Sequence, residues 1–446
     1  MNPGPEILRA TVLHTPRNPF SEENALEAYP DGGLAVGDGR ILAAGDYPQV
    51  RTAFPEAVVR DWRGSAILPG LVDTHVHFPQ TRIIGGLGLP LLDWLRLHAF
   101  PEEMRMSDAG YAGEVAREFV RSLARHGTTT ALVFGAHFGP ATELLFQAAC
   151  AAGVRVAAGL VLSDVRLPEP LLQTPEQAYR ASRELIARYH GEGGQQYAVT
   201  PRFALSASEG MLEVCGALLR EQPDLLFQTH LNENLEEVAQ VRAAFPWAGS
   251  YLEVYDRYGL AGPRSVFAHN VHGTDGELER LAAAGSSVAT CPSSNAVLAS
   301  GIFPIRRHLA AGVRFALGTD VGAGTGFGIL KEALQCYLVQ RLAPDGALLS
   351  PVHLLYLATR AGAEALGLAE ETGDFTPGKS ADLVRWLPPE GTPLALSMKR
   401  ADSPEWLLAA LIAQGGAESV CEVRVAGRAV PLGLTRNPQM CDYSLE

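Results

Sequence analysis

The sequence is poor in lysine and in long apolar runs. Lysine stands only at positions 331, 379 and 399, so arginine supplies nearly all of the 36 basic residues. The 49 acidic residues give a formal net charge of -13, which argues against a nucleic-acid backbone or an anionic membrane surface as a partner. Because no stretch is long and apolar enough to cross a bilayer, we expect no membrane span.

The six cysteines also lack the spacing of a redox or metal motif. They stand at positions 150, 215, 291, 336, 421 and 441, and no two are separated by two residues. A chain of 446 residues with 47% apolar composition can bury a large core without disulfide bonds. We therefore predict free thiols. The first residues show no basic start followed by an apolar run, which predicts a cytoplasmic protein.

Apolar strand-like runs alternate with helical patterns through most of the chain. Eight such runs lie at 65–77, 128–137, 154–164, 197–206, 225–231, 265–270, 287–294 and 314–320. Helical patterns such as GYAGEVAREFVRSLARHG follow them. Eight strand–helix alternations predict a (β/α)₈ barrel in an α/β protein.

The two ends of the chain have a different pattern, with short strands and turns. GGLAVGDGRILAAGD near the N-terminus contains a hairpin signal at Gly37-Asp38-Gly39. KSADLVRWL and VCEVRVAGRAV near the C-terminus are strand-like and bounded by turns. We predict that the two ends, 1–66 and 376–446, close on each other as one small β domain, and that 67–375 form the catalytic barrel.

Several predicted barrel strands end in side chains that bind metals. His75 and His77 share one face of the first strand, because alternate residues of a strand point the same way. His230, His269 and Asp320 end later strands. The carboxyl ends of barrel strands meet at one mouth, where the chemistry of such barrels takes place. Polar groups gathered there without partners are costly, although satisfied polar residues at a barrel rim are the alternative.

Three imidazoles and a carboxylate are a ligand set that suits Zn²⁺, with Fe²⁺ as the second choice. We therefore predict a metal-dependent hydrolase whose metal is held by His75, His77, His230 and Asp320.

Six sequence segments resemble the amidohydrolase superfamily. They are PGLVDTHVH, QTHLNE, AHNVHG, CPSSN, LGTD and PGKSADLV, and the resemblance runs from about residue 60 to 430. It implies a distorted (β/α)₈ TIM barrel, with the metal at its mouth, beside a small β-sandwich built from both chain ends. Two-metal members of the superfamily bridge their ions with a carbamylated lysine on the fourth strand. The fourth run, YAVTPRFALS, has no lysine, glutamate or cysteine, so the resemblance implies one metal per chain.

Glu233 follows His230 in the pattern HxxE. By itself it could be a carboxylate favoured by a helix N-terminus, but the resemblance places it among the deaminases of the superfamily. A metal lowers the pKa of bound water from 15.7 to about 7, which supplies a nucleophile at neutral pH. The resemblance implies that Glu233 moves protons to the substrate ring and that Asp320 takes the proton of the water. His269 then orients the attacking oxygen and is a weak or absent metal ligand.

Two longer segments narrow the resemblance to the guanine deaminases. They are HVHFPQTRIIGGLGLPLLDWLRLHAFPEE and VTPRFALS. The implied reaction is hydrolysis of guanine to xanthine and ammonia in purine catabolism, with Gln80 and Arg202 gripping the polar edge of the purine. Phe203 would flank the ring, Phe78 and Pro79 would line the cavity, and Trp94 and Phe100 would close its mouth. The implied substrate-binding set is completed by His77, His230, Glu233 and Asp320.

Other functions stay open at this stage. An aminohydrolase of 8-oxoguanine, of a modified adenosine or of a triazine would keep the same ligands, and a non-catalytic scaffold of the same fold is an alternative of another class. We expect His137 to be structural and leave the role of His272 open. The resemblance implies a homodimer.

Overall fold

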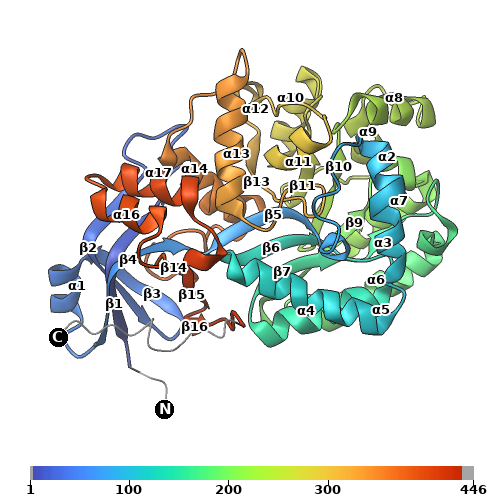
Figure 1. The fold of residues 1–446 in the computed structure, drawn as a ribbon. Helices are drawn as coiled ribbons and strands as arrows, with labels where there is room; N and C mark the ends of the chain where they lie inside the picture. The colour runs from blue at the N-terminus through green and yellow to red at the C-terminus, as the bar shows by residue number, and fades with distance from the viewer. Residues whose placement is uncertain (1–3, 434–446) are drawn as a thin grey trace.

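Eight parallel strands form a nearly closed barrel in the computed structural model, which describes residues 4–433 (Figure 1). Each of the eight predicted runs contains one barrel strand, so the predicted barrel is confirmed. The order across the sheet is β13-β12-β11-β10-β9-β7-β6-β5, and the short β8 (Val161–Leu162) pairs with β9. In chain order the barrel strands are β5 (Leu71–His77), β6 (Thr128–Phe134), β7 (Arg155–Gly159), β9 (Gln196–Pro201), β10 (Leu226–Leu231), β11 (Ser265–His269), β12 (Ser287–Thr290) and β13 (Arg314–Leu317).

Helices follow the barrel strands and cover the outside of the barrel (Figure 1). Before β14 the structure has α1 (Tyr47–Ala53), α2 (Leu91–Trp94), α3 (Phe100–Arg105), α4 (Ala109–Arg125), α5 (Gly139–Ala152), α6 (Pro175–Tyr189), α7 (Glu209–Glu221), α8 (Leu235–Ala244), α9 (Tyr251–Asp256), α10 (Asp275–Ala284), α11 (Pro292–Val297), α12 (Ile305–Ala311), α13 (Ile329–Leu342), α14 (Pro351–Ala358) and α15 (Arg360–Ala365). Two later helices, α16 (Pro393–Arg400) and α17 (Pro404–Gln414), pack near the barrel, where α17 contacts α13 and α14.

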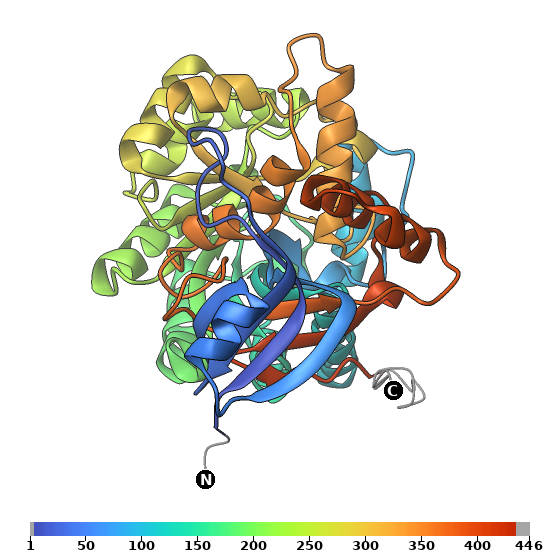
Figure 2. The same ribbon diagram turned by 90° about the vertical axis from the view of Figure 1, so that its left-hand side faces the viewer.

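A second sheet joins the two ends of the chain, as predicted. Its seven strands follow the order β16-β15-β14-β4-β1-β2-β3 in one hydrogen-bonded path. Figure 2 shows its N-terminal and C-terminal strands side by side. The strands are β1 (Glu6–His14), β2 (Glu27–Gly37), β3 (Arg40–Asp46), β4 (Val58–Pro69), β14 (Leu383–Trp386), β15 (Val420–Val425) and β16 (Arg428–Ala429). Of the predicted C-terminal part, residues 434–446 lie outside the described residues.

The predicted hairpin joins β2 to β3. Its two turn residues, Asp38 and Gly39, have positive φ values of 49° and 76°, the conformation that a two-residue turn needs to match the twist of its strands. A side chain at Gly39 would also place its Cβ 2.7 Å from the carbonyl oxygen of Ala426. Glycine at this position therefore lets the hairpin approach the C-terminal strands closely.

The second sheet leads directly into the first barrel strand. Only Gly70 separates β4 from β5, and its N–H donates to the carbonyl of Asp382, 3.0 Å away. The strand that carries His75 and His77 is thus anchored at its start by the sheet that both chain ends build.

Backbone hydrogen bonds link β5 to the segment after β13 and so join the two ends of the barrel sheet. The N–H of Asp320 donates to the carbonyl of His75 at 2.9 Å, and the N–H of His77 donates to the carbonyl of Val321 at 3.0 Å. These bonds lie at the carboxyl ends of both strands, beside the predicted metal ligands.

The buried carboxylate of Asp73 reinforces the same junction. Its Oδ1 accepts the N–H groups of Thr319 (3.0 Å) and His75 (3.2 Å), and its Oδ2 accepts the hydroxyl of Thr319 (2.6 Å). One side chain on β5 therefore fixes the backbone of both sides of the junction.

Two smaller expectations concern cysteines and membranes. Cys150, Cys215, Cys291 and Cys336 carry free thiols, as predicted, whereas Cys441 lies outside the described residues. Between residues 4 and 433, no helix has both the length and the apolar character that a membrane crossing requires.

Replacing Asp73 tests the junction. Asp73→Ala removes the acceptor of three buried donors, and unsatisfied buried donors are costly, so we expect the thermal midpoint to fall by roughly 3–8 °C. Asp93→Ala is the matched control, because Asp93 is exposed and, among residues 4–433, its carboxylate pairs with the exposed Arg96 alone. A scanning fluorimetry measurement that gives both variants the same midpoint would contradict this role of Asp73.

Candidate metal centre and active site

The imidazoles of β5 and β10 converge with Asp320 at the barrel mouth. The Nε2 atoms of His75 and His77 lie 3.2 Å apart, and each lies 3.2 Å from Oδ1 of Asp320. His230 Nε2 lies 3.2 Å from His77 Nε2. Tetrahedral ligands that bind Zn²⁺ at about 2.0–2.1 Å stand roughly 3.3 Å from one another. The separations therefore fit donors that share one ion.

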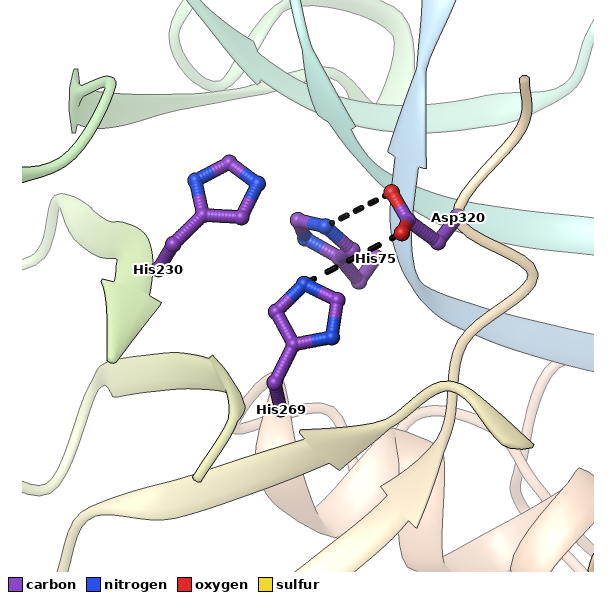
Figure 3. A group of neighbouring side chains, drawn as sticks. All are labelled: His75, His230, His269 and Asp320. Carbon is purple, nitrogen blue, oxygen red and sulfur yellow. Dashed lines mark ion pairs between the residues drawn. The ribbon is translucent and has the colours of Figure 1, made fainter. Parts of the chain in front are cut away.

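His269 belongs to the same group but lies farther from the carboxylate. Figure 3 shows it with His75, His230 and Asp320, and the ligand atoms of these four residues lie within 4.8 Å of one another. His269 Nε2 is 3.9 Å from Oδ2 of Asp320 and 3.6 Å from Oε2 of Glu233. All five polar residues from the strand ends thus meet at one point, with His269 on the side of Glu233.

Hydrogen bonds outside the cluster set the orientation of two imidazoles. His230 Nδ1 donates to the backbone carbonyl of Arg202 at 2.6 Å, and His269 Nδ1 donates to Oδ1 of Asn295 at 3.0 Å. Because the proton of each ring is used at Nδ1, the lone pair of each Nε2 faces the cluster. His269 Nε2 is buried and has no hydrogen-bond partner within the described residues.

The electrostatics favour neutral imidazoles at His75, His77 and His230 and an ionised Asp320. Burial lowers the pKa of His77 to about 4 and takes the pKa of His230 well below its usual value. Burial alone would raise the pKa of Asp320, but hydrogen bonds with His75 and His77 outweigh it and hold that pKa well below its usual range. Neutral imidazoles and a carboxylate are the forms that bind a metal ion. Ser294 also donates to Oδ2 of Asp320, at 2.5 Å.

The backbone adopts rare conformations where it delivers these side chains. Asn232, His269, Asn270 and Asp320 all have positive φ values, of 49°, 71°, 45° and 48°. Such values are uncommon for residues other than glycine and gather at functional sites. Each residue lies just beyond or at the end of a barrel strand, so the strained bends turn the chain at the mouth.

Glu233 lies buried next to His269. Burial, with the nearby charges of Glu237 and Asp320, raises the pKa of Glu233 well above its usual value. Ser300 donates to its Oε1 at 3.5 Å, and the carboxylate of Glu237 accepts the backbone N–H of Glu233 at 3.1 Å. A carboxyl group with a raised pKa can hold a proton at neutral pH and donate it.

Gln80 and Arg202 meet at a buried carboxylate, Glu103, to which sequence analysis gave no role. Gln80 Nε2 donates to Glu103 Oε1 at 2.8 Å, and Arg202 Nη1 donates to both oxygens at 2.7 and 3.0 Å. Gln80 Oε1 accepts the N–H of Gly322 at 3.0 Å, and His137 Nε2 lies 3.2 Å from Glu103 Oε2. One feature of the sequence could have pointed to Glu103. It is the FPEE stretch that begins at Phe100, which belongs to the segment that resembles the guanine deaminases.

The other side chains expected around a substrate are buried or partly buried aromatic and apolar residues. Phe203 follows Arg202 and is 7% exposed, and the Phe100 ring centre lies 5.4 Å from the Arg202 guanidinium. Trp94 is buried, and its Nε1 has no hydrogen-bond partner within the described residues. Phe78 and Pro79 are buried in the short turn after β5, where Phe78 packs against Phe119.

Phe134 is a neighbour of the metal cluster that the sequence did not indicate. Its ring centre lies 5.0, 4.5 and 4.7 Å from those of His75, His77 and His230. It ends β6, so it forms an apolar wall beside the ligands.

The role of His272 was left open by the sequence. Its Nε2 lies 2.7 Å from the carbonyl of Ser300, and the side chain of Ser300 contacts Glu233.

None of the three lysines provides a bridge between two metals on β9. Lys331 is exposed on α13 and its Nζ donates to the carbonyl of Thr325. Lys379 pairs with Asp374, and Lys399 is exposed on α16. β9 itself, QYAVTP, offers no carboxylate or thiol.

The chain is similar to several known proteins over nearly its whole length. A probable guanine deaminase of Deinococcus radiodurans is 55% identical over 431 residues, which cover 95% of this chain and 98% of that protein. The structure of guanine deaminase from E. coli matches with a TM-score of 0.92 and 39% identity, over 96% of this chain and 99% of that one. The structure of guanine deaminase from C. acetobutylicum, with guanine bound in its active site, matches with a TM-score of 0.87 and 26% identity, over 96% of this chain and 100% of that one.

The profile of the amidohydrolase family matches residues 66–430, which span the whole barrel and the C-terminal strands. The match includes every strand end described above. The chain therefore belongs to the amidohydrolase family.

Proposed function

We propose that this chain is a guanine deaminase, which hydrolyses guanine to xanthine and ammonia. The observation that carries the proposal is the meeting of two groups at one barrel mouth. One is the cluster of imidazoles and Asp320 beside Glu233, a buried carboxyl group whose pKa is raised. The other is the donor pair Gln80 and Arg202. The similarity to guanine deaminases over nearly the whole chain supports the same substrate.

The residues that would hold the metal are His75, His77, His230 and Asp320, with Zn²⁺ preferred over Fe²⁺ for this donor set. When bound, the ion supplies a strong nucleophile at neutral pH by lowering the pKa of water from 15.7 to about 7. Because no lysine, glutamate or cysteine lies on β9, we propose one ion per chain.

The protein side chains supply the proton transfers. Asp320 accepts a proton from the attacking water, and the unpaired Nε2 of His269 accepts a hydrogen bond from the same oxygen. Glu233 donates a proton to N3 as the oxygen adds to C2, so negative charge does not build up on the ring. Return of the proton from Asp320 to the amino group releases ammonia. The proton of the new hydroxyl at C2 passes to Glu233, which restores the proton that Glu233 gave to N3 and leaves a carbonyl at C2.

Gln80 and Arg202 read the oxo-bearing edge of the purine. Guanine presents two acceptors there, O6 and N7. The guanidinium can only donate, and the amide nitrogen of Gln80 donates as well. Phe203, Trp94 and Phe100 supply the apolar surroundings of the ring.

The remaining expectations follow the resemblance. We propose a cytoplasmic homodimer whose catalytic barrel spans 67–375 and whose chain ends, 1–66 and 376–446, form the small β domain.

Metal analysis tests the centre itself. Purified enzyme should contain about one transition-metal ion per chain, zinc before iron, since the ligand set closes around a single ion. A strong chelator should abolish ammonia release from guanine, and added Zn²⁺ should restore it. Two firmly bound ions per chain, measured by mass spectrometry of the metals, would refute the single-metal site.

Glu233→Gln tests the proton donor. The amide cannot donate an acid proton, so kcat for guanine should fall by roughly 10²- to 10⁴-fold with metal content unchanged. Glu236→Gln is the matched control, because Glu236 is exposed one turn away on α8 and should leave turnover intact. Steady-state ammonia release from both variants gives the answer, and near-normal turnover in Glu233→Gln would rule out the assigned role.

Arg202→Lys tests the substrate edge. Lysine keeps the charge beside Glu103 but loses the planar fork, so KM for guanine should rise roughly 10-fold or more while kcat changes less. The backbone carbonyl that orients His230 is unchanged in this variant, so metal content serves as the internal control. A variant whose kinetics match those of the wild type would discredit this contact with the purine.

A further inference from the structure

Glu103 lies at the centre of the polar network that faces the substrate. Its side chain is 2% exposed and sits on α3. It receives hydrogen bonds from Gln80 and Arg202 and lies within hydrogen-bond distance of His137. Burial alone would raise the pKa of Glu103, but Arg202, His137 and Gln80 hold that pKa well below its usual range. The network therefore contains an ionised carboxylate with every oxygen satisfied.

This carboxylate determines which way the Gln80 amide points. An ionised carboxylate only accepts hydrogen bonds, so Gln80 must turn its nitrogen toward Glu103. At the other end of the amide, Oε1 accepts the N–H of Gly322. A flipped amide would place oxygen against carboxylate and nitrogen against an N–H donor. The flip is thus excluded at both ends.

The same carboxylate fixes the donors of Arg202. Both Glu103 oxygens accept from Nη1, which leaves the other guanidinium N–H groups for a ligand. Together with the second hydrogen on Gln80 Nε2, these groups form a face made of donors. Such a face fits a ligand edge that carries two acceptors.

We propose that Glu103 is the positioning residue that makes this enzyme select a 6-oxopurine over a 6-aminopurine. The inference rests on the proposed guanine deaminase function. A 6-amino group in place of O6 would point its hydrogens at the fixed N–H donors of Gln80 and Arg202. A site in which buried donors face other donors rejects such a ligand strongly. Glu103 does not touch the purine in this account, because it acts through Gln80 and Arg202.

The alternative is that Glu103 only balances the buried charge of Arg202. A lost charge balance would weaken every purine alike and would leave the ratio between two purines unchanged. Selectivity therefore separates the two roles, and 2,6-diaminopurine is the probe. It carries an amino group in place of the 6-oxo group, so its N1 also lacks the hydrogen that guanine has, and it keeps the 2-amino group that is hydrolysed.

The experiment measures ammonia release from guanine and from 2,6-diaminopurine by wild-type enzyme and by Glu103→Gln. The new amide can donate as well as accept, which frees Gln80 to flip. We expect KM for guanine to rise while kcat changes less, and the guanine-to-diaminopurine ratio of kcat/KM to fall roughly 10- to 100-fold, the effect of one hydrogen bond to a charged group. Glu102→Gln is the matched control, because Glu102 contacts Arg105 and Tyr111 instead, and its ratio should match that of the wild type.

Two further variants keep the test decisive. Gln80→Met removes the fixed donor without touching Glu103 and should lower the same ratio, which covers the case in which Glu103→Gln fails to fold or to bind metal. Glu103→Asp keeps the charge and should raise KM while preserving the ratio within about threefold.

The outcomes separate this inference from the proposed function. An unchanged ratio in Glu103→Gln or in Gln80→Met, or an equal loss on both purines, overturns the inference while guanine deamination by the wild type stands. Wild-type enzyme that releases no ammonia from guanine overturns the proposed function and this inference with it.

Discussion

The closure of the barrel between β5 and the segment after β13 is the constraint on which the site depends. β5 and β13 stand at opposite ends of the sheet order, yet His75 on β5 and Asp320 in the segment after β13 have ligand atoms 3.2 Å apart. Backbone hydrogen bonds between these same two residues, and between His77 and Val321, join the strands where the ligands project. The geometry of the ligands is therefore set by the backbone and not by flexible side chains. It follows that a bound metal and the closed barrel would stabilise each other, since a ligand that binds only the closed form favours it.

Arg202 connects the metal centre with the substrate edge. Its backbone carbonyl holds the Nδ1 proton of His230, while its guanidinium pairs with Glu103. The two contacts use different parts of one residue at the end of β9. The position of the His230 ring is therefore linked to the position of the Arg202 guanidinium. In the proposed reaction, this arrangement would fix the distance between the metal centre and the groups that bind the far edge of the purine.

The sequence predicted the barrel and the meeting of its strand ends because both depend on regular periodicity. Parallel strands bring their carboxyl ends together whatever the details of packing, so His230, His269 and Asp320 could be placed with His75 and His77 from pattern alone. The role of Glu103 could not be predicted this way, because it lies on a short helix whose path depends on tertiary packing. The different distances of His77 and His269 from Asp320 could not be predicted from strand periodicity either. Positive φ values at His269 and Asp320 change the direction in which those side chains project. The second sheet was predicted from its composition, whereas its single path of seven strands depends on pairings between the two ends of the chain.

The distribution of unpaired polar atoms adds a separate argument for the chemistry. Two buried carboxylates near the metal cluster have their partners inside the protein: Asp73 accepts three hydrogen bonds, and Glu103 accepts from both Gln80 and Arg202. His269 Nε2 is an exception within the described residues, as it is buried, holds a lone pair and has no donor. Burying an acceptor without a donor costs free energy, and the positive φ of His269 adds backbone strain at the same residue. A donor that arrives with the reactants can pair with this open acceptor. In the proposed reaction, the attacking water is that donor.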